Sequence, residues 1–378
     1  MNFCGKSWLE ISKSAIKNNV RALAALTNKR TGFLAVVKAN AYGHGLEIAA
    51  KEAIRAGADW LGVDNVSEAE RARAAVRGAP ILILGYTPRS AIRRALNTNA
   101  RLIVYDPEVV SAIGQTKRLA RIHLKIENGT KRQGVGEKGL RLILREARKY
   151  KSIVIEGLST HYANIEDTTD HRYAAAKLTE FVRLANLAQK LWGRPIPIRH
   201  TAASAAAILF PETHFNLARF GIALYGLWPS RETMVSAKER KINLKLEPAL
   251  SWKAILAQVK DVKKGTPVSY GLTARVTRDS KVAVVPVGYS DGYDRGVSSI
   301  GEVLIRGRRA PILGRVCMNM FMIDVTDIGG AKAEDEVVLI GRDRTEFVSA
   351  DELAAKIGTI NYEIVSRISA ETGRRAVA

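Results

Sequence analysis

The feature that most constrains the fold is an alternation of short apolar runs with amphipathic helical segments, repeated eight times. The runs have the length and composition of buried strands. They occupy residues 33–38, 60–64, 80–84, 101–105, 122–127, 153–161, 196–200 and 219–225. Segments with helical spacing lie around and between them, at 14–26, 46–56, 67–77, 88–96, 107–117, 137–149 and 172–191. Eight such units predict an α/β fold, a (β/α)8 TIM-type barrel. A doubly wound open sheet is the alternative that counting strands does not exclude.

The pattern changes after about residue 240, where short β-rich runs follow one another closely between Gly and Pro residues. These runs lie at 259–262, 281–287, 303–305, 312–316, 321–325 and 336–340, and helical spacing returns only at 351–357. This pattern of short, closely spaced strands predicts a smaller, mainly antiparallel β domain. We therefore expect a barrel over residues 12–240 and a β domain over 241–378, with residues 1–11 adding a strand to the β domain.

Composition excludes several classes of protein. Hydrophobic residues make up 47% of the 378, enough for a sizeable core. No apolar run approaches the roughly 20 residues that a membrane-spanning helix needs, and the N-terminal residues lack the apolar segment of a signal peptide. The only two cysteines, Cys4 and Cys317, do not indicate a disulfide framework. We expect a cytoplasmic protein without a membrane partner.

The formal net charge of +22 is large and raises the hypothesis of a nucleic-acid or anionic-surface partner. However, Lys and Arg are spread along the chain, and no basic arm or stripe interleaved with aromatic residues stands out. We interpret the charge as a general property of the surface and expect no nucleic-acid partner.

Several chemically capable side chains follow the predicted strands. Lys38, His161 and His200 fall at or near carboxyl ends of strands, and Lys125 lies within two residues of one. Both candidate folds bind ligands at this edge of the sheet. A lysine amine there can attack a carbonyl carbon if its surroundings lower its pKa. The alternative is a lysine that ends a strand and points to water.

The run Lys38-Ala39-Asn40-Ala41-Tyr42-Gly43-His44-Gly45 resembles the lysine motif of alanine racemases, enzymes that use pyridoxal 5'-phosphate (PLP). The resemblance extends through further motifs over nearly the whole chain. It implies that Lys38 binds PLP covalently and is one of two catalytic acid/base groups. It also implies that Tyr42 contacts the cofactor phosphate.

A second motif, residues 219–226, resembles the family segment that binds both ends of the cofactor. The resemblance places Arg219 against the pyridine nitrogen and gives the backbone N–H groups of Gly221 and Ile222 to the phosphate. A guanidinium cannot accept a proton from the ring, so the ring stays neutral and is a weaker electron sink. Without the motif, such an arginine is more often a surface cation.

Two further segments resemble parts of the cofactor site. Ser204 corresponds to the serine that binds the phosphate, although Ala203 stands where the family usually has Asn. Ser204 has an alternative interpretation as a helix N-cap. His161 corresponds to the histidine that links the arginine to the catalytic tyrosine, and is otherwise a core histidine.

Residues 125–132 resemble the segment that binds the substrate. Its arginine, Arg132, is implied to contact the substrate carboxylate and the phenolic oxygen of the cofactor. Lys125 corresponds to a lysine that is carbamylated in many members. A carbamate would be an anion that orients Arg132. The interior of this segment departs from the usual Asp-Thr-Gly-Met.

Motifs in the predicted β domain imply a homodimer with shared active sites. Tyr270, in residues 268–273, corresponds to the second catalytic base, which the other subunit supplies. Met318 corresponds to a partner residue at the substrate carboxylate, with Asn319 where the family commonly has Asp. Residues 288–295, which include Arg295, resemble the substrate access corridor. Tyr362 corresponds to a tyrosine that reaches the phosphate.

The resemblance predicts an isomerase that racemises alanine by a two-base mechanism, without a metal, and supplies D-alanine for peptidoglycan. Lys38 would act on the face of the D-enantiomer and Tyr270 on that of the L-enantiomer. The alternatives are a racemase of broader specificity, for serine or other amino acids, and a PLP decarboxylase of the same architecture. The decarboxylases pair the pyridine nitrogen with a carboxylate. A non-catalytic PLP-binding barrel protein is a third possibility, but it would lack the second domain.

Overall fold

The computed structural model describes residues 5–378 as two compact units. The barrel unit comprises residues 14–41 and 46–248. The β unit comprises the N-terminal residues up to Lys13, residues 42–45 and residues 249–378. Cys4 lies outside the described residues. No helix within residues 5–378 is long and apolar enough to cross a membrane.

The barrel unit is built on eight parallel strands in the order β8-β7-β6-β5-β4-β3-β2-β9. They are β2 (Gly32–Val36), β3 (Trp60–Val63), β4 (Ile81–Ile83), β5 (Ala100–Val104), β6 (Ala120–Lys125), β7 (Ile153–Ser159), β8 (Ile198–His200) and β9 (Leu217–Phe220). Backbone hydrogen bonds from Asn216 to Arg199 (3.1 Å) and from Arg219 to Ala202 (3.2 Å) draw the two ends of this order together. The predicted (β/α)8 barrel is therefore confirmed, and the open-sheet alternative is excluded.

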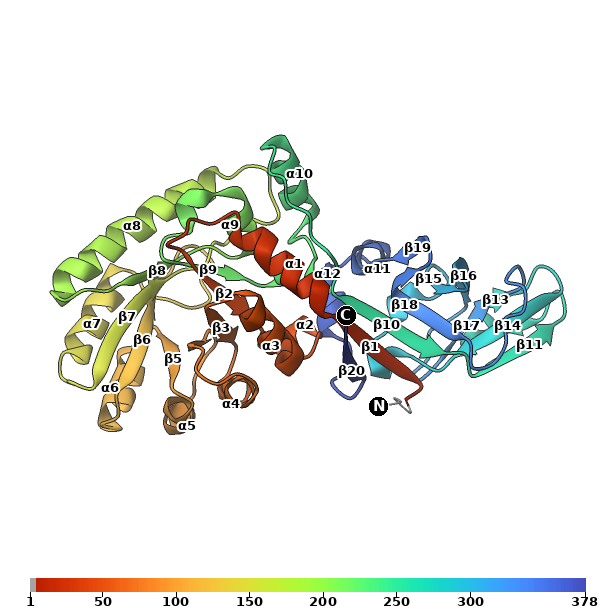
Figure 1. Ribbon diagram of the computed structural model, residues 1–378, viewed down its shortest axis with the longest axis horizontal. Helices are drawn as coiled ribbons and strands as arrows, with labels where there is room; N and C mark the ends of the chain where they lie inside the picture. The colour runs from red at the N-terminus through yellow and green to blue at the C-terminus, as the bar shows by residue number, and fades with distance from the viewer. Residues whose placement is uncertain (1–4) are drawn as a thin grey trace. The chain divides into compact units, whose positions relative to one another are not determined.

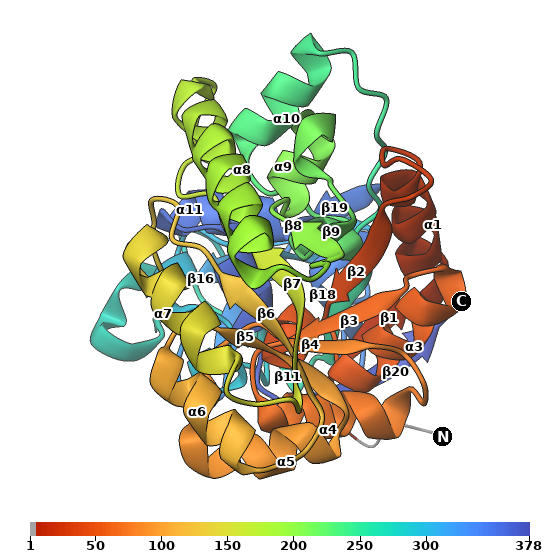
Figure 2. The same cartoon turned by 90° about the vertical axis from the view of Figure 1, so that its left-hand side faces the viewer.

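Helices surround these strands, as Figures 1 and 2 show. They are α1 (Lys13–Ala24), α3 (Leu46–Ala56), α4 (Val66–Ala75), α5 (Ile92–Asn97), α6 (Pro107–Gln115), α7 (Glu137–Ala147), α8 (Arg172–Trp192), α9 (Ser204–Leu209) and α10 (Arg231–Glu239). Local chemistry sets their ends. The Asp106 side chain caps α6 by accepting from the Glu108 N–H (2.8 Å), and α8 ends at Gly193 in the left-handed conformation.

Two local predictions are wrong. The predicted strand 219–225 ends at Phe220, and its second half forms the 3-10 helix η3 (Ile222–Tyr225). Periodicity cannot separate a buried strand from a buried helical turn in so short an apolar run. The alternative of Ser204 as a helix N-cap is also wrong. The N-cap of α9 is Ala203, which has extended dihedral angles, and Ser204 is the first helical residue.

The β unit contains a mainly antiparallel sheet in the order β11-β14-β17-β16-β15-β18-β10-β1-β20, with β19 paired to β18 (Figure 1). Strand β1 (Ser7–Ser12) lies between β10, antiparallel to it, and β20, parallel to it. The other strands are β10 (Leu250–Ile255), β11 (Gln258–Val262), β14 (Ser280–Val285), β15 (Glu302–Ile305), β16 (Arg308–Leu313), β17 (Phe321–Asp324), β18 (Glu336–Asp343), β19 (Glu346–Val348) and β20 (Gly373–Val377). A separate pair is formed by β12 (Pro267–Val268) and β13 (Ala274–Arg275). Helices α11 (Ala350–Ile357) and α12 (Asn361–Ser366) complete the unit.

Candidate active site

The backbone turns left-handed directly after Lys38, which follows β2 at the carboxyl end of the strand. In α2 (Lys38–Tyr42) the φ angles of Ala39, Asn40, Ala41 and Tyr42 are 52°, 53°, 57° and 52°. Residues with a Cβ atom avoid this conformation because it costs roughly 1–2 kcal/mol per residue. Four such residues in succession therefore need compensating contacts.

Side chains of the barrel unit supply these contacts. The Glu68 carboxylate accepts hydrogen bonds from the backbone N–H groups of Asn40 (3.3 Å) and Asp64 (2.8 Å). The Asn40 side-chain oxygen accepts from the Leu46 N–H and from Arg71, both at 3.1 Å. The chain is thus fixed immediately after Lys38.

Arg219, at the carboxyl end of β9, is buried, and its guanidinium is oriented by neutral acceptors. Its Nη1 donates to His200 Nδ1 (2.7 Å) and to the His200 carbonyl (2.9 Å). Its Nη2 donates to the carbonyls of Thr160 and Thr201, both at 2.8 Å. These contacts use the four N–H bonds of the terminal nitrogens. Within residues 5–378 no acceptor binds the remaining Nε–H, so this donor is available to a ligand.

Burial lowers the pKa of Arg219 and of two histidines of the barrel unit. Burial lowers the pKa of Arg219 to about 10, so the guanidinium is still charged at neutral pH. Burial, together with the Arg219 charge, holds the pKa of His200 and of His161 well below 6.5. Both imidazoles are therefore neutral at neutral pH. The histidine hydrogen-bonded to Arg219 is His200, a role that the sequence did not reveal. His161 follows Thr160, whose carbonyl also binds Arg219.

Ser204 and Gly221 are bound to each other. The Gly221 N–H donates to Ser204 Oγ at 3.0 Å, and both residues are buried. Ser204 Oγ retains its own hydrogen as a donor. The Ile222 N–H begins η3 and therefore has no acceptor within that helix. This arrangement presents donors to an anion.

Lys125 ends β6, and burial, followed by the charges of Arg219 and Arg132, lowers its pKa from 10.5 to about 7. An appreciable fraction of its amine is therefore neutral at neutral pH. The loop between Lys125 and Arg132 is organised by Glu127, whose carboxylate accepts from the N–H groups of Gly129 (2.6 Å) and Lys131 (3.0 Å). Arg132 is exposed.

In the β unit, Tyr42 and Tyr362 lie side by side, with ring centroids 5.9 Å apart. Gly43 makes this approach possible, because a Cβ atom there would lie 1.9 Å from the Val365 carbonyl oxygen. The two tyrosines implied to reach the cofactor phosphate are therefore neighbours, although 320 positions separate Tyr42 and Tyr362 in the sequence.

The structure also brings the predicted β-unit residues together. Tyr270 begins η4 (Tyr270–Leu272), which the Ser269 side chain anchors by hydrogen bonds to the N–H (2.9 Å) and carbonyl (3.0 Å) of Arg315. Ser290 binds the neighbouring loop through its N–H and hydroxyl, both to the Met318 carbonyl, and its Oγ accepts from Asn319 at 2.8 Å. These loops line a hollow of about 870 Å³ formed by Ser269, Tyr270, Tyr289, Arg295, Arg315, Val316, Cys317, Met318, Asn319, Met320 and Met322.

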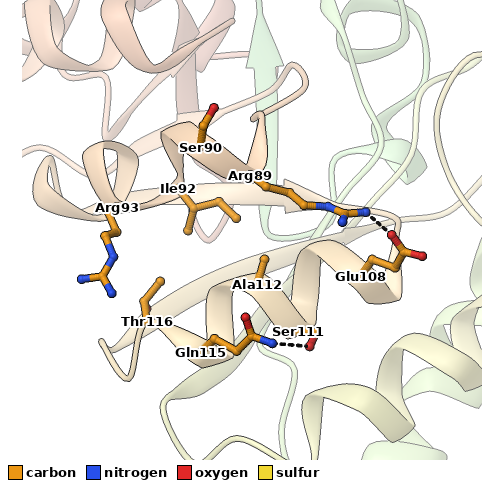
Figure 3. Close-up of a pocket in the computed structure, with 9 residues that line it drawn as sticks. All are labelled: Arg89, Ser90, Ile92, Arg93, Glu108, Ser111, Ala112, Gln115 and Thr116. Atoms are coloured by element: carbon orange, nitrogen blue, oxygen red, sulfur yellow. Dashed lines mark hydrogen bonds and ion pairs between the residues drawn. The ribbon is translucent and has the colours of Figure 1, made fainter.

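A different hollow, of about 620 Å³, lies between α5 and α6 and is shown in Figure 3. Its facing charges pair with each other, Arg89 with Glu108, and Gln115 donates to Ser111 at 3.4 Å. Arg93 points away from this pair (Figure 3). No residue of the motifs discussed above lines it.

Comparisons with known proteins agree with this arrangement. The model of the alanine racemase N-terminal domain matches residues 11–229, and that of the C-terminal domain matches residues 249–376. The chain belongs to the alanine racemase family. It is 40% identical over 372 residues to an alanine racemase of Methanococcus maripaludis, covering 97% of each chain. It is 38% identical to one of Leptospira interrogans, covering 98% of this chain and 96% of the relative. The crystal structure of alanine racemase from Bacillus anthracis with bound L-Ala-P has a TM-score of 0.92 and 36% identity, covering 100% of this chain and 96% of that one.

Alanine racemases depend on PLP, which is therefore the cofactor of this chain. The donor set of the barrel unit fits this cofactor. A pyridine nitrogen needs one donor, which the Arg219 Nε–H offers. A phosphate needs several, which Ser204 and the backbone from Gly221 to Ile222 offer. Lys38 provides the amine.

Proposed function

We propose that this chain interconverts L- and D-alanine by a two-base reaction with PLP, and that Lys38 and Tyr270 are the two acid/base groups. Membership of the family over both domains supports the substrate and the reaction. The geometric observation that carries the proposal is Arg219, a buried cation with one free donor on the strand next to that of Lys38.

When bound, PLP supplies an electron sink that makes the α-hydrogen of the amino acid acidic. The Arg219 Nε–H would donate to the pyridine nitrogen, and the guanidinium cannot accept a proton from it. A carboxylate at this place, as in the PLP decarboxylases, would favour a protonated ring. Arg219 therefore favours the racemase over the decarboxylase.

The remaining cofactor contacts are at the phosphate. Ser204 Oγ–H and the N–H groups of Gly221 and Ile222 would donate to it, and the resemblance to the family implies that the hydroxyls of Tyr42 and Tyr362 would reach it. Lys38 would hold the cofactor covalently through its amine. His161 would help to orient Tyr270 of the partner subunit.

Proton transfer uses two groups on opposite faces of the α-carbon. Lys38 removes or returns the hydrogen on the face of the D-enantiomer, and Tyr270 does so on the face of the L-enantiomer. As one group removes a proton, the conjugate acid of the other delivers one. Arg132 would bind the substrate carboxylate, and Met318 of the partner subunit would lie beside it.

We assign a carbamate to Lys125. The Lys125 ammonium first loses one proton to become neutral; the amine then forms an N–C bond with carbon dioxide and releases a second proton to solvent, so that the former cation becomes an anion beside Arg132. The lowered pKa of Lys125 supports this assignment, because only the neutral amine reacts. Protein equilibrated with ¹³C-bicarbonate should give a carbamate ¹³C signal that is absent from Lys125→Ala. The same signal in both proteins would contradict it.

We propose that the enzyme is a homodimer in which each β unit completes the site of the other subunit. The exposed surface of the β unit supports a partner, since Tyr270 is 73% and Met318 56% exposed. Leu272, Tyr289 and Met320 extend the exposed apolar residues. Light scattering should give twice the mass of 41.3 kDa, whereas a monomer that racemises at full rate would contradict shared sites.

We place the enzyme in the cytoplasm, where its product is D-alanine for peptidoglycan. The presence of only two cysteines is in line with a reducing compartment. Expression in a bacterial strain that lacks alanine racemase should remove its requirement for D-alanine. A strain that still needs D-alanine while making soluble, PLP-loaded protein would contradict this role.

The test of the function is direct. Purified protein loaded with PLP should convert L-alanine to D-alanine, measured with D-amino-acid oxidase, and L-serine more slowly. Lys38→Ala should abolish conversion, whereas Lys51→Ala, an exposed lysine of α3, should not. Equal turnover of serine would indicate the broader racemase. Failure of the wild-type protein to bind PLP would overturn the function.

A further inference from the structure

A continuous row of hydrogen bonds crosses the barrel unit from Arg219 to Glu156. Arg219 Nη1 binds His200 Nδ1 at 2.7 Å, and His200 Nε2 lies 2.9 Å from His123 Nδ1. His123 Nε2 in turn lies 3.2 Å from Glu156 Oε2. The four residues come from β9, β8, β6 and β7, and both imidazoles are completely buried.

Gly157 leaves room for this row on β7. His123 pairs with Gly157 across the β6–β7 ladder, and a Cβ atom at Gly157 would lie 2.5 Å from His123 Nδ1. Only a glycine allows the imidazole to lie against the strand at this place. The row is therefore built into the packing of the barrel.

The chemistry of the two ends sets the direction of every hydrogen bond. A guanidinium only donates, so His200 Nδ1 must accept and the proton of this ring is on Nε2. That proton is donated to His123 Nδ1, which places the His123 proton on Nε2. The Glu156 carboxylate accepts it. Each imidazole is therefore confined to one tautomer between a cation and an anion.

The charges around the row favour this state. Burial lowers the pKa of His123, and burial with the Arg219 charge lowers that of His200, so both rings are neutral at neutral pH. Burial opposes ionisation of Glu156, but hydrogen bonds from His123 and Arg101 prevail and bring its pKa to about 2. Arg101 lies 3.0 Å and Arg121 3.6 Å from the Glu156 carboxylate.

We propose that Glu156 is a positioning residue that acts on the cofactor site through His123 and His200, by fixing the tautomers that let His200 accept from Arg219. Without an acceptor at Glu156, the His123 proton is free to move to Nδ1. The His123 Nδ1–H would then face the His200 Nε2–H. If the His200 proton moved to its own Nδ1 in response, it would point at the Arg219 guanidinium, and His200 could no longer accept from Arg219. The inference rests on the proposed function, in which Arg219 faces the cofactor.

The first measurement uses ¹⁵N-histidine NMR of the protein without PLP. In the wild type, His123 and His200, assigned with His123→Gln and His200→Gln, should be neutral with protonated Nε2. Glu156→Gln, whose amide oxygen still accepts, should keep this pattern. Glu156→Leu should convert part of one or both rings to the Nδ1–H tautomer. Unchanged tautomers in Glu156→Leu would overturn the proposal.

The second measurement uses the PLP-loaded enzyme. In Glu156→Leu, kcat should fall by about 10–100-fold, as when an outer partner of a ligand is lost elsewhere, with little change in KM. Glu156→Gln should recover most of this loss. Glu70→Leu removes a carboxylate of α4 that pairs with Arg94 of α5; it is the matched control and should change neither quantity. Normal kcat in a Glu156→Leu enzyme with altered tautomers would also overturn the proposal.

His123→Leu breaks the row one step closer to Arg219 and serves if Glu156→Leu does not fold. It should alter the His200 signal and lower kcat to a similar extent. An unchanged His200 signal with normal kcat would overturn the inference. Failure of this inference can be told apart from failure of the proposed function. If the proposed function fails, the wild-type protein does not racemise alanine, whereas its histidine tautomers can still be measured.

Discussion

At the scale of single residues, burial acts differently on groups that can lose their charge and on groups that cannot. Arg219 stays charged because its pKa falls only to about 10, and neutral acceptors compensate its burial. Lys125 is brought to about 7, where it exchanges its proton near neutral pH. Arg219 is thus a fixed cation, whereas the charge of Lys125 in the same unit varies near neutral pH.

The lowered pKa of Lys125 predicts a pH-dependent stability. Between about pH 7 and 10.5 the unfolded chain binds a proton at Lys125 that the folded chain does not, so folding stability rises with pH in this window. Lys125→Met removes this dependence. The free energy of unfolding of Lys125→Met should exceed that of the wild type most at pH 7 and below, and this difference should shrink toward pH 10. Urea unfolding in CO2-free buffer measures it, with Lys51→Met as the exposed control. A difference that does not change with pH would show that Lys125 is not desolvated.

Isotope exchange distinguishes Lys38 from Tyr270 as bases. In Tyr270→Phe, racemisation should slow by about 10²–10⁴-fold in both directions, because the equilibrium constant between mirror images is unity. In D2O, Lys38 should still exchange the α-hydrogen of D-alanine, whereas L-alanine should lose its exchange. Proton NMR of each enantiomer measures this. Equal exchange of both enantiomers in the mutant would indicate one mobile base or water.

At the scale of elements, the sequence predicted those with a repeated hydrophobic pattern. Strands such as β3 and helices such as α8 follow that pattern closely. The left-handed turn at residues 39–42 was not predicted, because only one of its four residues, Asn40, is of a type that favours this conformation, and contacts with Glu68 and Arg71 hold it.

Local sequence patterns also miss the part of the candidate site that depends on contacts between distant residues. Local motifs pointed to Lys38, Arg219 and Ser204 as candidate site residues, whereas the row from Arg219 to Glu156 depends on pairing between strands. His123 and His200 are 77 positions apart in the sequence, and no local spacing connects them. The signal in the sequence was limited to a histidine within each of two predicted strands, 122–127 and 196–200.

The strain of the left-handed turn predicts an unusual response to glycine. Ala39 is exposed with φ 52°, so Ala39→Gly should remove a cost of roughly 1 kcal/mol without loss of packing. Part of this gain is offset by the greater entropy of the unfolded chain, which leaves a net stabilisation of a few tenths of a kcal/mol or more. Ala176→Gly, at an exposed position of α8, should instead destabilise by about 1 kcal/mol. Urea unfolding compares the two, and destabilisation by both would refute strain at Ala39.

At the scale of the whole molecule, the two proposed bases belong to different compact units. Lys38 is part of the barrel unit, and Tyr270 is part of the β unit, where it is largely exposed. An acid/base group that is exposed on its own unit can be brought to the substrate by a second copy of the chain. The proposed homodimer provides this through twofold symmetry, in which both sites are equivalent.

Mixed dimers test this arrangement. Lys38→Ala and Tyr270→Phe chains should each be inactive or nearly so. With shared sites, a mixed dimer contains one site with both substitutions and one with neither. Free exchange of equal amounts makes half of the dimers mixed, so roughly a quarter of the wild-type activity should return. Native mass spectrometry of differently tagged chains must show that exchange has occurred, and mixing wild-type with Lys38→Ala chains controls for losses during exchange. If mixed dimers form and no activity returns, each chain completes its own site, and Tyr270 does not serve the partner's Lys38.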